Sequence, residues 1–362
     1  MVTTTYPPHV SGVARSVETT ATELRLRGVR CIVLAPSGGE VDCCNDHFVI
    51  RVPAVKVNGF YMTVRTRPTI RQVIRRLEPH IIHSHHPFLI GDAALLERGS
   101  RPLVYTYHTN YEHYVQRFVS SEQIEKLAIE KAVGYANHCQ LVLAPSTDTL
   151  KKLRRDGVRV PIAVLPTGID DSIFRLGQRK QPGEPRVVGF VSRLGPEKNL
   201  VGLARGLGRL EPGRYRVIVV GDGPSRESFL TDLRAAGLMV HYAGVLKGPV
   251  LAAAYRGMDV FVFASRAETQ GMVVAEAALC GTPVVALDAP GVRDVVRGAV
   301  GRLVSAVEDL APAIEATCRE RRPPELVSGA VSGFTARECG RRLLELYLCT
   351  GHLTPPPPGG TL

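Results

Sequence analysis

The chain of 362 residues lacks the features that mark membrane-spanning, secreted and zinc-binding proteins. No apolar run approaches the roughly 20 residues that a membrane-spanning helix needs, and the N-terminus has neither the charged nor the apolar region of a signal peptide. None of the eight cysteines belongs to a Cys-x-x-Cys pair, so neither a zinc site nor a redox motif is indicated. We therefore expect a cytoplasmic protein whose cysteines are free thiols.

The chain also lacks the motifs of nucleic-acid-binding proteins, although it is basic. It has 45 Lys and Arg against 34 Asp and Glu, a formal net charge of +11. Basic proteins often meet nucleic acids, anionic membranes or phosphorylated ligands, but no Arg-Gly repeat or other RNA- or DNA-binding motif is present. The charge therefore indicates a membrane surface or a nucleotide ligand, unless it reflects only an Arg-rich composition.

Apolar runs alternate with helix-like stretches, the pattern of parallel sheets with crossover helices. We predict an α/β protein of two doubly wound, Rossmann-like domains that face a cleft, residues 1–168 and 169–335. Pro and Gly interrupt regular structure at the join. The expected strands are Gly28–Ala35, Ile81–Ser84, Leu103–Tyr107 and Leu141–Ala144, then Arg186–Ser192, Tyr215–Gly221, Val240–Ala243, Val260–Ala264 and Pro283–Leu287.

Two terminal segments complete this organisation. An amphipathic helix is predicted within residues 336–349, and the Pro- and Gly-rich residues 350–362 are expected to be disordered. At the other end, only Met1–Thr4 precede the first loop. Either the first, central strand is short or the start codon is misplaced. We favour the second explanation, because a truncated central strand would weaken the sheet.

Glu268 and Glu276 are the most informative pair of residues. Glu268 follows the apolar strand at Val260–Ala264, and Glu276 lies about one turn into the Ala-rich helix that comes next. The start of a helix binds anions, because its backbone N–H groups are unpaired and its dipole end is positive. A carboxylate on each side of an anion site suits a sugar nucleotide. The alternative is that both are surface charges, as most Glu residues are.

The segment ASRAETQGMVVAEAALCGTPVVA at 264–286 resembles the Glu-x7-Glu motif of family 4 retaining glycosyltransferases, which have the GT-B fold. The stretch GFVSRLGPEKN at 189–199 is similar to a second signature of that family. The segments IHSHHPF at 82–88 and HTNYEHY at 108–114 resemble bacterial 1,2-diacylglycerol 3-glucosyltransferases and their relatives. The resemblance covers about residues 1–345 and implies that the C-terminal helix crosses back onto the first domain.

The resemblance implies a donor site in the second domain. Glu276 would accept hydrogen bonds from the ribose hydroxyls, and Glu268 would contact the transferred sugar. Arg193 and Lys198 would clamp the diphosphate, whose charge grows as the sugar–oxygen bond breaks, and with Glu268 they are candidates for catalysis. By composition alone, a solvated loop explains the two cations equally well. The backbone N–H groups expected to meet phosphate belong to Gly271, Met272 and Val273, and the helix start at Gly12 of the first domain would meet phosphate or acceptor.

The acceptor side is assigned to the first domain. His108 follows a strand at its carboxyl end, where α/β proteins bind ligands, and it can donate a catalytic hydrogen bond to a hydroxyl or phosphate. His85 and Tyr111 are the other acceptor candidates. A structural His that caps a loop is the alternative for His108. Three His lie within residues 83–86, but no carboxylate is nearby, so we expect no metal site.

The reaction implied by the resemblance moves a hexosyl group, with retention, from a nucleotide sugar such as UDP-glucose to diacylglycerol in glycolipid synthesis. It needs no metal or other cofactor. Neither Glu is expected to be a glycosyl nucleophile, unlike the carboxylates of glycosidases, because the departing phosphate would deprotonate the incoming hydroxyl. Alternatives are a phosphoinositide, soluble sugar or glycan acceptor (for example in a mannosyltransferase), a nucleotide-sugar epimerase, and a non-catalytic sugar-nucleotide-binding protein.

A lipid acceptor implies a peripheral position on the inner face of the plasma membrane. Four arginines, at positions 67, 71, 75 and 76, lie opposite an Ile/Val stripe on a helix-like segment that could rest on an anionic bilayer. The alternative is a surface helix whose apolar stripe packs on the sheet.

Overall fold

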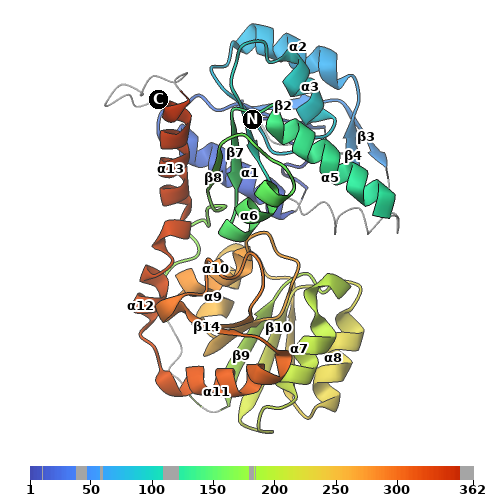
Figure 1. Cartoon of the computed structure of the whole chain (residues 1–362). Helices are drawn as coiled ribbons and strands as arrows, with labels where there is room; N and C mark the ends of the chain where they lie inside the picture. The colour runs from blue at the N-terminus through green and yellow to red at the C-terminus, as the bar shows by residue number, and fades with distance from the viewer. Residues whose placement is uncertain are drawn as a thin grey trace. The chain divides into compact units, whose positions relative to one another are not determined.

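The computed structural model describes residues 1–9, 11–37, 47–57, 60–108, 122–178, 183 and 185–350. The chain divides into two compact α/β units (Figure 1). Unit 1 comprises Met1–Gly168 and the segment that begins at Ala336, and unit 2 comprises Ile169–Thr335. The tail predicted at 350–362 lies outside the described residues, except for Thr350.

Unit 1 is built on short parallel strands that are largely buried, as strands covered on both faces are. β1 (Val33–Pro36) pairs with β2 (Val49–Val52), and β5 (Ile82–Ser84), β6 (Leu103–Thr106), β7 (Leu141–Ala144) and β8 (Ile162–Val164) form a second parallel set in that order. The hairpin of β3 (Ala54–Val57) and β4 (Phe60–Thr63) is antiparallel. The helices before the join are α1 (Gly12–Arg25), α2 (Thr66–Leu77), α3 (Ile90–Glu97), α5 (Glu122–Asn137) and α6 (Thr147–Arg155).

Val2 occupies the place of the central strand in unit 1. It forms parallel bridges to Leu34 of β1 and to Ser84 of β5. The hydrogen bonds from Val2 N to His83 O and from Thr3 N to Leu34 O measure 2.8 and 3.0 Å. The first residues of the chain therefore join the two sets of parallel strands into one sheet.

Helix α13 (Ala336–Cys349) belongs to unit 1, although it follows unit 2 in the sequence. Its buried side chains Leu343 and Tyr347 share a hydrophobic cluster with Leu24 of α1. The two helices approach so closely that a Cβ on Gly340 would lie 2.7 Å from the Cβ of Glu23. The apolar face of α13 is therefore part of the core of unit 1.

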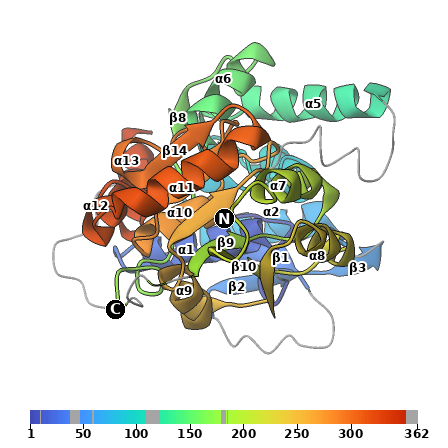
Figure 2. The ribbon, with the colours of Figure 1, turned by 90° about the horizontal axis from the view of Figure 1, so that it is seen from below.

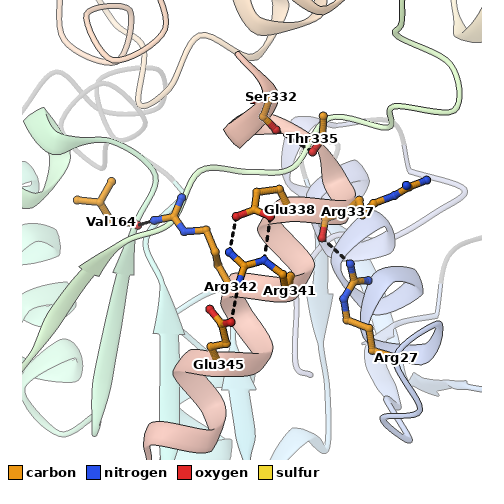
Figure 3. Close-up of polar contacts among 9 residues, drawn as sticks. All are labelled: Arg27, Val164, Ser332, Thr335, Arg337, Glu338, Arg341, Arg342 and Glu345. Atoms are coloured by element: carbon orange, nitrogen blue, oxygen red, sulfur yellow. Dashed lines mark hydrogen bonds and ion pairs between the residues drawn. The ribbon is translucent and has the colours of Figure 1, made fainter. Parts of the chain in front are cut away.

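Polar contacts fix the same helix along its length (Figure 3). Arg27 of α1 donates to the carbonyl of Arg337 in its first turn, and Arg342 donates to the carbonyl of Val164 at 2.9 Å. On the outer side, Arg341 forms ion pairs with one Glu a turn before it and another a turn after it. Both backbone contacts lie within unit 1, so α13 is bound there by polar as well as apolar interactions.

Helix α2 packs against the core of unit 1 through its apolar side. Ile70 and Ile74 are buried in the core. On the exposed side, Arg67 and Arg71 bind Glu97 of α3 with N–O distances of 2.5 and 2.8 Å. These contacts favour a surface helix over one that lays its apolar face in a bilayer. Across the ranges that the structure describes, no helix is both long and apolar enough to cross a membrane.

Unit 2 contains a six-stranded parallel sheet in the order β11-β10-β9-β12-β13-β14. Its strands are β9 (Arg186–Val191), β10 (Tyr215–Val220), β11 (Met239–Gly244), β12 (Val260–Phe263), β13 (Val284–Leu287) and β14 (Gly301–Val304). Helices α7 (Leu200–Leu207), α8 (Arg226–Ala235) and α11 (Leu310–Glu320) cover one face, and α9 (Gly248–Arg256), α10 (Met272–Leu279) and α12 (Pro324–Gly329) cover the other (Figure 2). The predicted doubly wound architecture is confirmed for this unit.

Candidate active site

The switch point of the second sheet lies at the carboxyl ends of β9 and β12. The chain leaves β9 toward β10 on one side and returns to β12 on the other, so the strand order reverses between these neighbours. Doubly wound sheets bind ligands at such a point. The loops that follow the two strands, residues 192–199 and 264–271, carry the predicted donor residues Arg193, Lys198, Glu268 and Gly271.

Lys198 and Glu268 meet at this point. The Lys198 Nζ donates to Glu268 Oε1 at 2.5 Å, and each side chain is 17% exposed. The neighbouring Asn199, which has a left-handed backbone, donates from Nδ2 to the carbonyl of Ala264 at 3.2 Å. Two predicted site residues that are 70 positions apart thus lie in direct contact, with a second bond that joins the same two loops.

Arg193 lies on the same loop but has a different partner. Its guanidinium forms an ion pair with Glu197, four residues later, and the side chain is 41% exposed. The pair is open to solvent, so it contributes little stability. A ligand anion can therefore replace Glu197 as the partner of Arg193 at small cost.

The Gly-rich turn after β10 packs against the loop after β9. Gly221 has a φ of +121°, and a Cβ there would lie 1.8 Å from the carbonyl oxygen of Ser192. Leu194 N donates to Asp222 O at 2.9 Å, which holds the two loops together. The two glycines of this turn, Gly221 and Gly223, therefore serve loop packing, the structural interpretation of this motif.

Helix α10 begins at the switch point. Gly271 is its N-cap with φ +68°, a left-handed conformation that favours glycine, and Met272 and Val273 form the first turn. The first N–H groups of a helix have no intrahelical acceptor and carry the positive end of its dipole. Three of the predicted phosphate-binding residues, Gly271, Met272 and Val273, therefore lie between Glu268 and Glu276.

Glu276 is buried inside unit 2, where it is 2% exposed. The Tyr255 hydroxyl, from α9, donates to Glu276 Oε2 at 2.9 Å, and Tyr255 is itself fully buried. The Thr282 hydroxyl in turn donates to the carbonyl of Tyr255 at 2.7 Å. Sequence reasoning missed Tyr255, because nothing in a spacing of 21 residues marks the contact.

His85 and His108 meet at the carboxyl ends of β5 and β6 in unit 1. His85 Nδ1 and His108 Nε2 are 2.8 Å apart. His85 is 2% exposed, whereas His108 is half-buried. Burial lowers the pKa of His108 to about 3, with a smaller effect from His86, so the imidazole is neutral near pH 7. His85 is thus placed behind His108.

Two other predicted residues complete unit 1. Gly12 opens α1, whose N-cap Ser11 accepts a hydrogen bond from Ala14 N at 3.0 Å. Tyr111 lies outside the described residues. In the part of the chain that the structure covers, no three His, Cys, Asp or Glu side chains are grouped so that they could hold a metal ion.

A cavity of about 240 Å³ lies in unit 1 beside the loop that precedes α1. Its walls include the rings of Tyr6, His9 and Tyr61 and the Arg51 guanidinium, which is 5.8 Å from the centre of the Tyr6 ring. A larger cavity of about 480 Å³ in unit 2 lies at the amino-terminal edge of the sheet, where five arginines line it. That edge is opposite to the predicted donor residues.

Two family models match the chain and divide it as the units do. The model described as Glycosyltransferase Family 4 matches residues 10–173, and the model described as Glycosyl transferases group 1 matches residues 185–320. The alpha-monoglucosyldiacylglycerol synthase of Streptococcus pneumoniae is 29% identical over an alignment of 378 positions, which covers 96% of this chain and 85% of that protein. A GDP-mannose-dependent alpha-mannosyltransferase of Mycobacterium tuberculosis is 33% identical over an alignment of 316 positions, which covers 82% of this chain and 80% of that protein.

Solved structures share the fold. Anabaena HepE in complex with UDP and glucose matches with a TM-score of 0.73 at 22% identity, over 96% of this chain and 98% of that chain. Sucrose-phosphate synthase from Thermosynechococcus elongatus matches with a TM-score of 0.76 at 19% identity, over 94% of each chain. The fold is therefore GT-B, as predicted. With nucleotide-sugar enzymes among its relatives and a family model over its first half, the chain belongs to glycosyltransferase family 4.

Proposed function

We propose that the protein transfers a hexosyl group, with retention and without a metal, from a nucleotide sugar to the hydroxyl of diacylglycerol. The observation that carries this proposal is the contact of Lys198 with Glu268 at the switch point of the second sheet. It brings a diphosphate-binding cation and a sugar-binding carboxylate to the edge where doubly wound sheets bind nucleotides. The donor side of the reaction is thus assigned to unit 2, and the acceptor side to unit 1.

The diphosphate takes the place of the carboxylate partners of Lys198 and Arg193. When the donor binds, phosphate oxygens compete with Glu268 and Glu197 for these two cations. Glu268 then becomes available to accept hydrogen bonds from the sugar hydroxyls. The N–H groups at the start of α10 supply further donors to the phosphates. Both cations stabilise the charge that grows on the leaving group as the glycosidic bond breaks.

In the proposed donor site, Glu276 binds the ribose. Its carboxylate is held in place by the Tyr255 hydroxyl, so its oxygens are oriented before the nucleotide arrives. A buried carboxylate accepts charge-assisted hydrogen bonds, which are stronger than those of a neutral acceptor. This orientation favours a nucleoside over a free sugar phosphate.

The transfer step needs no protein nucleophile. The bond between C1 of the sugar and the phosphate oxygen breaks, and a bond between C1 and the acceptor oxygen forms on the same face. The proton of the acceptor hydroxyl moves to the departing phosphate, so the products are a glycoside and a nucleoside diphosphate. His108 donates a hydrogen bond on the acceptor side, where its neutral imidazole suits a hydroxyl or phosphate oxygen.

Two features of unit 1 support a lipid acceptor at an anionic membrane. The cavity of about 240 Å³ combines hydroxyl, aromatic and cationic walls, which suits the polar end of a glycerolipid. Arg75 and Arg76 of α2 are exposed, whereas Arg67 and Arg71 are engaged by Glu97. Each exposed cation near an anionic bilayer contributes about 1 kcal/mol of binding. We therefore place the protein at the inner face of the plasma membrane.

A mannosyltransferase is the second candidate. Relatives described as GDP-mannose-dependent alpha-mannosyltransferases come from Corynebacterium glutamicum, at 28% identity, and Mycobacterium tuberculosis, at 33%. These values are close to the 29% identity with the diacylglycerol-lipid enzyme. GDP-mannose is therefore tested beside UDP-glucose and UDP-galactose.

The test is transfer of radiolabel to lipid by the full chain. The three labelled donors are incubated singly with diacylglycerol vesicles and with vesicles that lack diacylglycerol. We expect label in the organic phase only when diacylglycerol is present, and from one donor. Label in a water-soluble glycoside would contradict the lipid acceptor, and an epimerised free sugar nucleotide would contradict transfer.

A further inference from the structure

The two histidines at the edge of unit 1 form a pair that can hold a single hydrogen between them. His85 Nδ1 and His108 Nε2 are 2.8 Å apart, with ring centres 5.1 Å apart and ring planes 19° apart. A neutral imidazole carries a hydrogen on one nitrogen and a lone pair on the other. Either His85 donates from Nδ1, or His108 donates from Nε2.

The other ring nitrogen of His85 decides between these arrangements. Nε2 of His85 is fully buried and has no hydrogen-bond partner. If His108 donated, the hydrogen of His85 would have to lie on this Nε2, as a buried N–H without an acceptor. If His85 donates from Nδ1, its Nε2 is only a buried lone pair. Orphaned N–H groups are the rarer of the two in folded proteins, so the geometry favours donation by His85.

The surroundings keep the pair neutral. Burial lowers the pKa of His85 well below its usual value, and the nearby groups His83, His86, His108 and the Met1 amino group lower it further. None of these groups is a carboxylate that could stabilise an imidazolium. A shared hydrogen between two neutral rings is therefore the state that exists near pH 7.

His83 supports His85 from behind. Its ring stacks on that of His85 with centres 4.3 Å apart and planes 28° apart. Its Nδ1 bonds to the hydroxyl of Tyr347 on α13, and its Nε2 is 2.6 Å from the Thr106 hydroxyl. The His83 ring is thus fixed by two hydrogen bonds, so the ring that it backs has little freedom to rotate.

We propose that His85 is a positioning residue that holds His108 as the tautomer with its hydrogen on Nδ1. In this tautomer, Nε2 of His108 accepts the hydrogen bond from His85, and Nδ1 of His108 carries the hydrogen. His108 cannot serve as a general base, because its one lone pair accepts the hydrogen bond from His85. This last step rests on the proposed function, and it agrees with proton transfer to the departing phosphate.

The tautomer is measured directly by long-range proton–nitrogen NMR of the full chain labelled with ¹⁵N-histidine. The spectrum of His108→Gln identifies the signals of His108. We expect a protonated Nδ1 and a bare Nε2 for His108 at pH 7, with or without substrates. A protonated Nε2 on His108 would overturn the proposal, whatever the activity of the protein proves to be.

Two variants of His85 test the mechanism. In His85→Asn, the amide Nδ2 takes the place of the imidazole Nδ1 as donor, so the tautomer of His108 should be retained. In His85→Leu there is no donor, so the Nε2–H tautomer should become populated. We expect kcat of the Leu variant to fall about 10- to 100-fold below that of the Asn variant, as when a residue that orients another functional group is removed.

Nucleotide binding separates this effect from a fold defect. Both variants should bind the nucleoside diphosphate with the same Kd, because neither substitution changes a residue that is assigned to the donor. Equal kcat values in the two variants, with the expected difference in tautomer, would overturn the positioning role. A failure of transfer with every donor and acceptor would contradict the proposed function but leave the tautomer measurement decisive.

Discussion

Replacing Glu276 with Gln should weaken nucleotide binding without disturbing the fold. The side chain is 2% exposed and keeps its volume in this exchange. The remaining oxygen can still accept the hydrogen bond from the Tyr255 hydroxyl, which measures 2.9 Å with the carboxylate present. The substitution therefore removes the negative charge and leaves the packing in place.

The magnitude follows from the loss of charge assistance. A hydrogen bond to a charged group contributes about 1.5–3 kcal/mol and one between neutral groups about 0.5–1.5 kcal/mol, so each ribose hydroxyl loses about 1–1.5 kcal/mol. Two hydroxyls lose about 2–3 kcal/mol, which raises Kd about 30- to 150-fold. Titration calorimetry with UDP and with GDP measures the Kd of the variant relative to that of the unchanged protein.

Tyr255→Phe is the matched control. It keeps the carboxylate and removes its buried donor, so the free energy of unfolding should fall by about 1–3 kcal/mol. Nucleotide affinity should fall less than in Glu276→Gln, because the carboxylate that contacts the ribose is kept and only its orienting hydrogen bond is lost. An unchanged Kd for both nucleotides in a folded Glu276→Gln protein would refute the ribose assignment.

Three further predictions concern the ion pair of Lys198, the contact of α13 with α1 and the buried histidines. Lys198→Ala should lower kcat/KM by about 10²- to 10³-fold, as when one donor to a developing charge is removed. The control Lys152→Ala breaks an ion pair of equal length and similar exposure in unit 1, and it should leave kcat/KM unchanged. An equal loss of kcat/KM in both variants would contradict the binding of the diphosphate by Lys198. Gly340→Ala should lower the free energy of unfolding by about 1–3 kcal/mol through overpacking against α1, whereas Gly134→Ala, with open space around it, should raise it by up to about 1 kcal/mol. Urea unfolding measures the change in the free energy of unfolding for each variant. Stabilisation by both substitutions would contradict the close approach of α13 to α1. Stability should fall as pH falls from about 6.5 to 4, because burial lowers the pKa of His86 to about 4 while the unfolded chain binds a proton near pH 6.5. For each such group, the free energy of unfolding changes by about 1.4 kcal/mol per pH unit in this range. His86→Asn should make this dependence on pH less steep in urea unfolding, and an unchanged dependence would contradict the lowered pKa of His86.

The sequence predicts most of unit 2, because its strands are continuous apolar runs. The fully buried strands β12 and β13 are such runs, and each is bounded by residues that interrupt a strand. The two glutamates lie where the spacing places them, one after a strand and one about a turn into α10. Local pattern is sufficient here because strand, loop and helix start are consecutive in the chain.

Contacts between distant segments could not be predicted in this way. Periodicity gives no sign that Tyr255 reaches Glu276, or that Lys198 is paired with Glu268 before a donor binds. The apolar stripe of α2 suits a bilayer and a protein core equally, and only the burial of Ile70 shows that it faces the core. The strands of unit 1 are predicted less completely than those of unit 2. The hairpin of β3 and β4 and the bridge at Val2 are too short to give an apolar run in the sequence.

A crystal structure of the full chain with a bound nucleoside diphosphate would show where the donor binds. We expect ribose hydroxyls within hydrogen-bond distance of Glu276, and a diphosphate in contact with Lys198 and Arg193 at the carboxyl ends of β9 and β12. The competing position is the cavity of about 480 Å³ at the amino-terminal edge of the same sheet, where five arginines could bind phosphate. A nucleotide bound there, with the pair between Lys198 and Glu268 intact, would contradict the assignment of the donor site.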